Sequence, residues 1–153
     1  MRLISSDFSD GAKIPRVSTC EGEDASPTLQ WSDAPPETRS FALICNDPDA
    51  PAGVWRHWAA YDISPTVAEL PRGAGRPGGK ETFKQAINDF GRPGYGGPCP
   101  PRGHGVHHYR FSLLALDVDR LAAPRNAHCR DVEREARKHA LAEAVLVGTY
   151  ERR

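Results

Sequence analysis

Three apolar runs along the chain predict the strands of a sheet core. SFALIC (40–45) is apolar at successive positions, which is typical of a strand that is buried on both faces. WAAYDI (58–63) and YRFSLLALD (109–117) are further runs rich in aromatic and aliphatic residues. Large apolar side chains at or near these strands are expected to lie in the core: Trp31, Phe41 and Phe111.

The segment DVEREARKHALAEAVLVG (131–148) follows a different period. Its apolar residues recur at helical spacing, and Glu133 precedes Arg137 by four residues, which favours an ion pair on a helix surface. The positions that define this face are Val132, Ala136, Ala140, Ala144 and Val145. We therefore expect one amphipathic helix that ends at Gly148 and is followed by a short strand or tail.

Length and charge place the chain in a broad class. Its 153 residues are expected to form one domain, residues 1–153, that buries its own core. The 20 basic residues balance the 20 acidic ones, which argues against a nucleic-acid partner or an anionic membrane surface. No apolar run approaches the roughly 20 residues of a membrane span, and the start, MRLISSDFSDG, meets charge and glycine too early for a secretory signal. We expect a cytoplasmic protein without an integral membrane segment.

The four cysteines are dispersed. No CxxC pair or regular spacing indicates a zinc site or a disulfide framework, so buried or unreactive thiols are the main expectation. Cys20 and Cys99 each lie in a loop that contains glycine or proline, TCEG and GPCPP. A bond between these two cysteines stays open.

The stretch CNDPDAPAGVWRHW (45–58) gathers Asp47, Asp49 and His57 on a segment stiffened by prolines. The two acids are two positions apart on an extended segment and can point to the same side. A solvated Asp-Pro turn with a hydrogen-bonded strand histidine is one interpretation. A polar binding pocket is the other.

A second loop, GYGGPCPPRGHGVHHY (94–109), favours the pocket. Its glycines permit close backbone approach, its successive amides can cradle an anion, and His107 stands at the entry to the long strand. The glycine- and proline-rich stretch between residues 64 and 106 is expected to form ordered surface loops. His104 and His128 are expected to be solvated loop or cap residues. If the fold brings the two loops together, their polar side chains form a small pocket.

The chain resembles the phosphatidylethanolamine-binding protein family, most closely its small bacterial and archaeal branch of Raf kinase inhibitor-like proteins. Five motifs carry the resemblance in order: GEDASPTLQW (22–31), CNDPDAP (45–51), WRHW (55–58), GYGGPCPP (94–101) and GVHHY (105–109). The resemblance implies a mostly β fold, with a large central antiparallel sheet, a smaller sheet packed on one face and one or two helices on the other.

The resemblance also implies an anion pocket. The positions that match the family's binding motifs are Asp47, Asp49, His57, Pro100, Pro101 and His107. It further implies cis peptide bonds at Ala50–Pro51 and Val54–Trp55. The chain departs from the family pattern at His108, where arginine is usual, at Asn46, where an acid is common, and after Arg153, where animal members continue into a helix that helps close the site.

The function implied is binding of a small anion or a phospholipid head group, with no cofactor. Two carboxylates suit an anion poorly, unless His57 and His107 are held protonated or the acids bind a protonated phosphate or the ammonium of ethanolamine. Regulation of a kinase, a protease or another partner protein follows from animal and fungal relatives, and a homodimer is compatible with the sequence. The alternative is a metal-dependent or Asp/His acid–base hydrolase that uses the same pocket.

Overall fold

The computed structural model describes residues 1–78 and 82–153, so part of the glycine-rich stretch expected to form surface loops lies outside the described residues. The elements in chain order are β1 (Arg2–Ile4), the 3-10 turn η1 (Arg16–Ser18), β2 (Leu29–Ser32), β3 (Ser40–Asp47), β4 (Trp55–Ile63), β5 (Glu69–Leu70), β6 (Lys84–Gln85), β7 (His107–Leu116), α1 (Cys129–Arg137) and β8 (Ala140–Tyr150).

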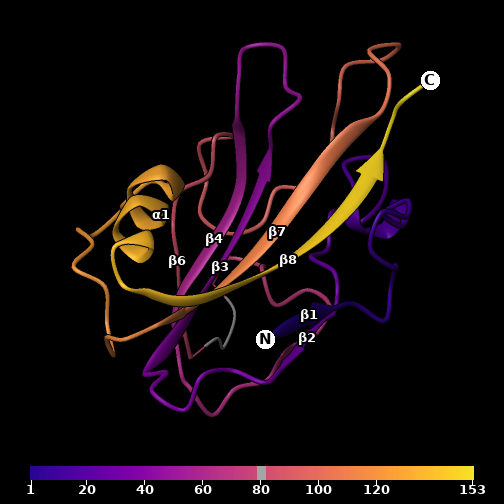
Figure 1. The fold of residues 1–153 in the computed structure, drawn as a ribbon. Helices are drawn as coiled ribbons and strands as arrows, with labels where there is room; N and C mark the ends of the chain where they lie inside the picture. Colours follow the sequence, from indigo (N-terminus) through magenta and orange to yellow (C-terminus); the bar gives the residue numbers. More distant parts are fainter. Residues whose placement is uncertain (79–81) are drawn as a thin grey trace.

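Two antiparallel sheets form the framework. The large sheet has the strand order β6-β4-β3-β7-β8, and the small sheet has the order β1-β2-β5. Figure 1 shows the long strands of the large sheet running side by side, with α1 on one side of them, next to β4, and β1 and β2 on the other side. The mostly β fold expected from the family resemblance is confirmed, with a single helix in the described residues.

Strand β3 is buried on both faces, as its unbroken apolar run predicts. Phe41 and Leu43 pack in the core cluster that includes β1, β2 and β5. Ala42 and Ile44 point the other way, into the cluster that includes α1. Because successive side chains of a strand alternate between faces, one apolar segment supplies both cores. The large apolar residues expected in the core are buried: Trp31, Phe41 and Phe111.

The prediction of one helix over residues 131–148 is wrong. Helix α1 starts earlier, at Cys129, and ends at Arg137, and the chain from Ala140 onward is strand β8. The predicted ion pair is present, with Arg137 Nε 3.0 Å from Glu133 Oε2. The apolar residues of this segment fit both helical spacing and strand alternation. Pairing with β7 stabilises the strand conformation in the second half, which is β8.

Gly148, predicted to end the helix, lies inside β8. A Cβ at this position would collide with the side chain of Ile14. The residue is therefore required for close packing of the N-terminal segment on the sheet rather than for a helix end.

The peptide bonds expected to be cis are trans. The described residues contain no cis peptide bond, and these include Ala50–Pro51 and Val54–Trp55. The turn between β3 and β4 is closed instead by a hydrogen bond from the Gly53 amide to the Ala50 carbonyl, with Gly53 at a φ of 106°. Glycine adopts this conformation at little cost, so the chain reverses without a strained peptide bond.

The cysteines divide into one bonded pair and two free thiols. Cys20 and Cys99 form a disulfide, which resolves the question that the sequence left open. Cys45 and Cys129 are free and buried. Structural disulfides are typical of oxidising compartments, so this bond weighs against the expected cytoplasmic location, which stays a prediction. Within the described residues, no helix has the length and apolar character needed to cross a membrane.

Candidate functional site

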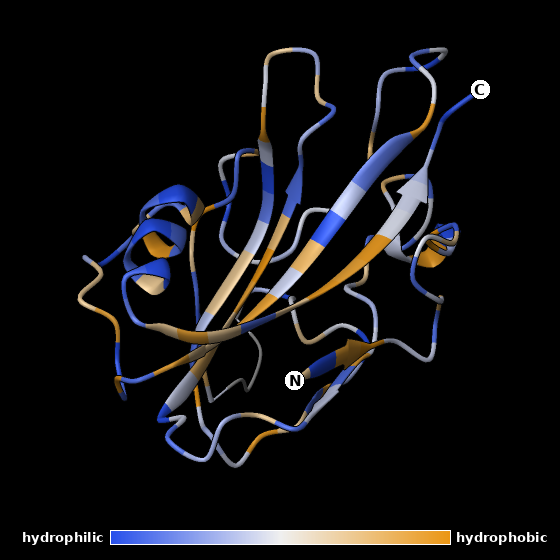
Figure 2. Cartoon of the chain, in the orientation of Figure 1, coloured by the Kyte–Doolittle hydropathy of each residue, from blue (hydrophilic) through white to orange (hydrophobic). Residues whose placement is uncertain are grey.

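Three neighbouring strands bring the predicted polar residues to one end of the large sheet. Asp47 is the last residue of β3, His57 lies near the start of β4, and His107 is the first residue of β7. Because β4, β3 and β7 are adjacent and antiparallel, the end of one strand meets the beginnings of the other two. Figure 2 shows polar colour on these strand ends and apolar colour toward the middle of the sheet.

A cavity of about 200 Å³ lies at this end of the sheet. Its walls are Asp47, Ala50, Pro51, Trp55, His57, Phe90, Cys99, Pro100, Pro101, His107 and Tyr109. The structure therefore brings together all but one of the residues predicted for the site. The exception is Asp49.

Asp49 does not line the cavity and instead binds His108. Its Oδ2 accepts hydrogen bonds from the His108 backbone amide at 2.8 Å and from His108 Nδ1 at 2.7 Å. Partial burial opposes ionisation of Asp49, but these bonds outweigh it and lower the pKa of the carboxyl. His108, which stands where the family usually has arginine, therefore makes an acid–base contact of its own.

A β-bulge directs His57 into the site. Cys45 pairs with Trp58 and Asn46 pairs with Arg56, which leaves His57 as the extra residue of β4. Bulges of this kind turn a side chain out of the regular alternation and are common beside functional sites. The loop opposite holds the ring, since His57 Nδ1 donates to the Gly96 carbonyl at 2.6 Å and the Gly96 amide donates to the His57 carbonyl.

Burial determines the charge state of His57. Desolvation lowers the pKa of the ring below its ordinary value of 6.5, although the Gly96 carbonyl and nearby acids act in the opposite direction. In the neutral ring, donation by Nδ1 leaves Nε2 as a hydrogen-bond acceptor. This part of the site is therefore not cationic, which disfavours the alternative in which His57 is held protonated and leaves the one in which the acids bind a protonated phosphate or an ammonium.

We expect the His57 ring to titrate with a midpoint below 6.5 in long-range ¹H–¹⁵N NMR spectra. The pKa of His57 is lower in the folded state than in the unfolded state. At pH values between these two pKa values the folded state therefore binds fewer protons, and the free energy of unfolding falls as the pH drops through this window. Replacement of His57 by Gln, which can still donate to Gly96, should reduce that fall. A midpoint above 6.5 would contradict the assignment of a neutral ring.

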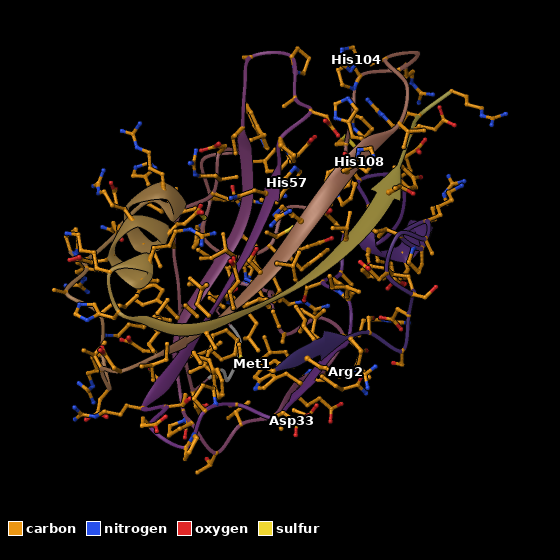
Figure 3. The ribbon with its side chains drawn as sticks, in the orientation of Figure 1. Met1, Arg2, Asp33, His57, His104 and His108 are labelled. Atoms are coloured by element: carbon orange, nitrogen blue, oxygen red, sulfur yellow. A yellow bond between two sulfur atoms is a disulfide. The ribbon has the colours of Figure 1, made fainter. Side chains whose placement is uncertain are left out.

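Asp47 and His107 form a buried pair beside His57. His107 Nδ1 lies 2.6 Å from Asp47 Oδ2, and both side chains are almost completely buried. Asp47 Oδ1 accepts the Asp49 backbone amide at 2.7 Å. His104, expected to be a solvated loop residue, is exposed, but its Nδ1 lies 2.6 Å from His107 Nε2. In Figure 3, His104 sits at the tip of the loop beyond the start of β7, with His57 and His108 nearer the strands.

The glycines of the loop 94–97 allow close packing against neighbouring segments, but their amides do not form an anion-binding cradle. A Cβ at Gly97 would collide with the Ser18 carbonyl, and one at Gly96 would collide with the Phe90 ring. The amides of residues 94–97, however, already donate to protein acceptors. The amides of residues 94–97 are therefore not available to an anion, and an anion-binding role of the rest of the loop 94–109 stays a prediction.

Two hydrogen-bond donors in the cavity wall were missed by the sequence reasoning. Tyr109 is fully buried, and its hydroxyl has no hydrogen-bond partner among the described residues. The indole Nε1 of Trp55 is also buried without a partner in that part of the chain. Burial and the nearby Asp47 raise the pKa of Tyr109, so the phenol keeps its proton. The strand period could have identified Tyr109, since it follows His107 by two positions and shares its face.

A metal centre is not apparent in residues 1–78 and 82–153. No group of three or more His, Cys, Asp or Glu side chains there is arranged to hold a metal ion.

Sequence comparisons relate the whole chain to one family. The family model described as phosphatidylethanolamine-binding protein matches residues 4–151. A UPF0098 protein of Aquifex aeolicus is 47% identical over 152 residues, which cover 99% of this chain and 89% of the relative. The UPF0098 protein PH1269 of Pyrococcus horikoshii is 42% identical and is matched over 76% of its length and 98% of this chain.

Solved structures agree with this relationship. The crystal structure of Escherichia coli YbcL, described as a member of the mammalian PEBP family, matches with a TM-score of 0.95 and 35% identity over 99% of this chain and 98% of that chain. The PEBP homologue CT736 of Chlamydia trachomatis matches with a TM-score of 0.87 and 37% identity over 99% and 97% of the two chains. The protein therefore belongs to the phosphatidylethanolamine-binding protein family.

Proposed function

We propose that the cavity binds a small zwitterionic head group of the phosphoethanolamine type, with the ammonium beside Asp47. Asp47 is a buried acid whose two oxygens each accept one protein N–H, which leaves lone pairs for a further donor. His57, neutral because of its burial, presents an acceptor at Nε2. A cationic N–H donor complements these acceptors, whereas a plain anion would be repelled by the carboxylate.

The phosphate of such a ligand would be bound by the two donors without partners. The Tyr109 hydroxyl and the Trp55 indole N–H are buried in the wall of the same cavity as Asp47. A buried donor without an acceptor is destabilising, and an incoming phosphate oxygen would relieve both. This combination of one buried acid and two unpaired donors in a single cavity is the observation that carries the proposal.

Size and family support a head group rather than a larger molecule. The cavity of about 200 Å³ is smaller than the about 300–1,000 Å³ typical of sites for drug-sized ligands. The matching family is described as phosphatidylethanolamine-binding. Regulation of a kinase, a protease or another partner protein stays a prediction from the family resemblance.

Calorimetric titration with phosphoethanolamine and with inorganic phosphate tests the proposal. Asp47→Asn should weaken the binding of phosphoethanolamine by about tenfold or more, because a charge-assisted hydrogen bond is lost, and should weaken that of phosphate less. Asp49→Asn is the matched control, since it makes the same change two residues away and outside the cavity. Equal losses of affinity for the two ligands would show that Asp47 does not bind the ammonium.

The same titration separates the binding protein from the hydrolase. We expect phosphoethanolamine to bind equally well with and without EDTA and to be recovered intact. Release of inorganic phosphate, or binding that needs a divalent metal, would favour the alternative of a metal-dependent or Asp/His hydrolase.

A further inference from the structure

A chain of three side chains connects the cavity wall to the surface. Asp47 Oδ2 contacts His107 Nδ1, and His107 Nε2 contacts His104 Nδ1, with 2.6 Å at each step. Asp47 and His107 are buried, whereas His104 is exposed and does not line the cavity. The two imidazole rings meet edge to face, with centroids 4.9 Å apart. His104 therefore covers the one nitrogen of His107 that Asp47 leaves free.

When the His107 ring is neutral, the hydrogen bonds along this chain run toward the carboxylate. A carboxylate that orients an imidazole accepts from Nδ1–H, and this fixes the tautomer of the ring. In the neutral ring, His107 Nε2 then carries a lone pair and can only accept. His104 Nδ1 must supply the proton of the outer hydrogen bond. The site at His107 Nε2 is consequently specific for a donor.

The backbone around His104 is anchored, whereas its exposed side chain is held by the hydrogen bond to His107. The Gly103 amide donates to the Arg152 carbonyl, and the His104 amide donates to the Pro101 carbonyl. Gly103 and Gly105 flank His104 at φ values of 74° and 93°, with open space where a Cβ would lie. Rotation of an exposed side chain is fast and needs no movement of the loop. His104 can therefore leave His107 while the fold stays unchanged.

We propose that His107 Nε2 is a subsite for an N–H donor of the ligand, such as a primary ammonium, and that His104 Nδ1–H fills this subsite in the absence of ligand. This inference rests on the proposed head-group function and adds to it a second acceptor position for the ammonium, on the opposite side of the His107 ring from Asp47. Withdrawal of the His104 ring exposes His107 Nε2, which lies on the side of the ring away from Asp47. A ligand with an N–H group replaces the hydrogen bond from His104 to His107 Nε2 with one of its own. A quaternary ammonium has no N–H and cannot form this bond.

The variant His104→Ala tests this subsite with two probes, phosphoethanolamine and phosphocholine. Removal of the competing donor should raise the affinity for phosphoethanolamine about two- to tenfold, the range expected for one net hydrogen bond. The affinity for phosphocholine, which has no N–H on its ammonium, should stay unchanged. His139→Ala is the matched control, because His139 is a partly exposed histidine bound to Asp117 at the other end of β7.

Long-range ¹H–¹⁵N NMR gives a second readout that a merely structural role of His104 would not change. We expect the neutral tautomer of His107 to carry its proton on Nδ1, and the Nε2 resonance to shift when phosphoethanolamine binds. Weaker binding of both probes in His104→Ala, or a neutral His107 that carries its proton on Nε2, would overturn the subsite and leave the head-group function standing. Failure of the unmodified protein to bind phosphoethanolamine would instead overturn the head-group function and the subsite with it.

Discussion

Replacement of Cys20 and Cys99 by serine is expected to lower the free energy of unfolding by about 2–4 kcal/mol, the usual contribution of a native disulfide. The two residues are 79 positions apart, so the bond closes a long loop and restricts the unfolded chain strongly. Urea denaturation followed by tryptophan fluorescence would measure the loss. An unchanged unfolding midpoint would mean that the surrounding hydrogen bonds already hold the loop.

The same bond is expected to stabilise the cavity. Cys99 is part of the cavity wall and directly precedes Pro100 and Pro101. The Cys20 backbone amide also donates a hydrogen bond to the Pro98 carbonyl, so the disulfide and this hydrogen bond hold the same loop. Reduction by dithiothreitol should therefore weaken phosphoethanolamine binding in the unmodified protein. The double serine variant is the control, since it should not respond to the reductant. Burial raises the pKa of the Cys45 and Cys129 thiols, which keeps them unreactive.

The central strands could be predicted because their pattern has one explanation. An uninterrupted apolar run such as residues 40–45 is too short for a long helix and needs cover on both sides. The segment 131–148 was misjudged because its small residues fit two periods. Val132 and Ala136 do lie on a buried helix face, but Ala144 and Leu146 alternate with more exposed residues on β8. Only the distant partner β7 distinguishes the two patterns in this half of the segment.

The sequence motifs predicted which residues belong to the candidate site, but not the contacts that these residues make. Asp47, His57 and His107 come from three segments, and the antiparallel sheet places them together. The bulge at His57 and the contact of Asp49 with His108 depend on strand register, which no local pattern specifies. His104 was missed for the same reason, since its role depends on a neighbour in the folded loop.

The core and the cavity wall depend on different phenylalanines, Phe111 and Phe90. Phe111 is fully buried in the core and packs on Phe8 with ring centroids 5.9 Å apart. Phe90 is 38% exposed, lines the cavity and meets the rings of Trp55 and His57 at 5.4 Å each. The first residue should therefore contribute mainly to stability and the second mainly to binding.

Phe111→Ala is expected to lower the free energy of unfolding by about 3–5 kcal/mol, because it leaves a cavity between the two sheets that the surrounding strands cannot fill. Phe90→Ala should cost only about 1 kcal/mol of stability, from the lost ring contacts, and should weaken phosphoethanolamine binding because the cavity loses a wall. Urea denaturation and calorimetry on both variants would measure the two effects. If Phe90→Ala kept full affinity, the ligand would have to bind elsewhere than against the His57 side of the cavity, and the head-group proposal would fail even in a fully folded protein.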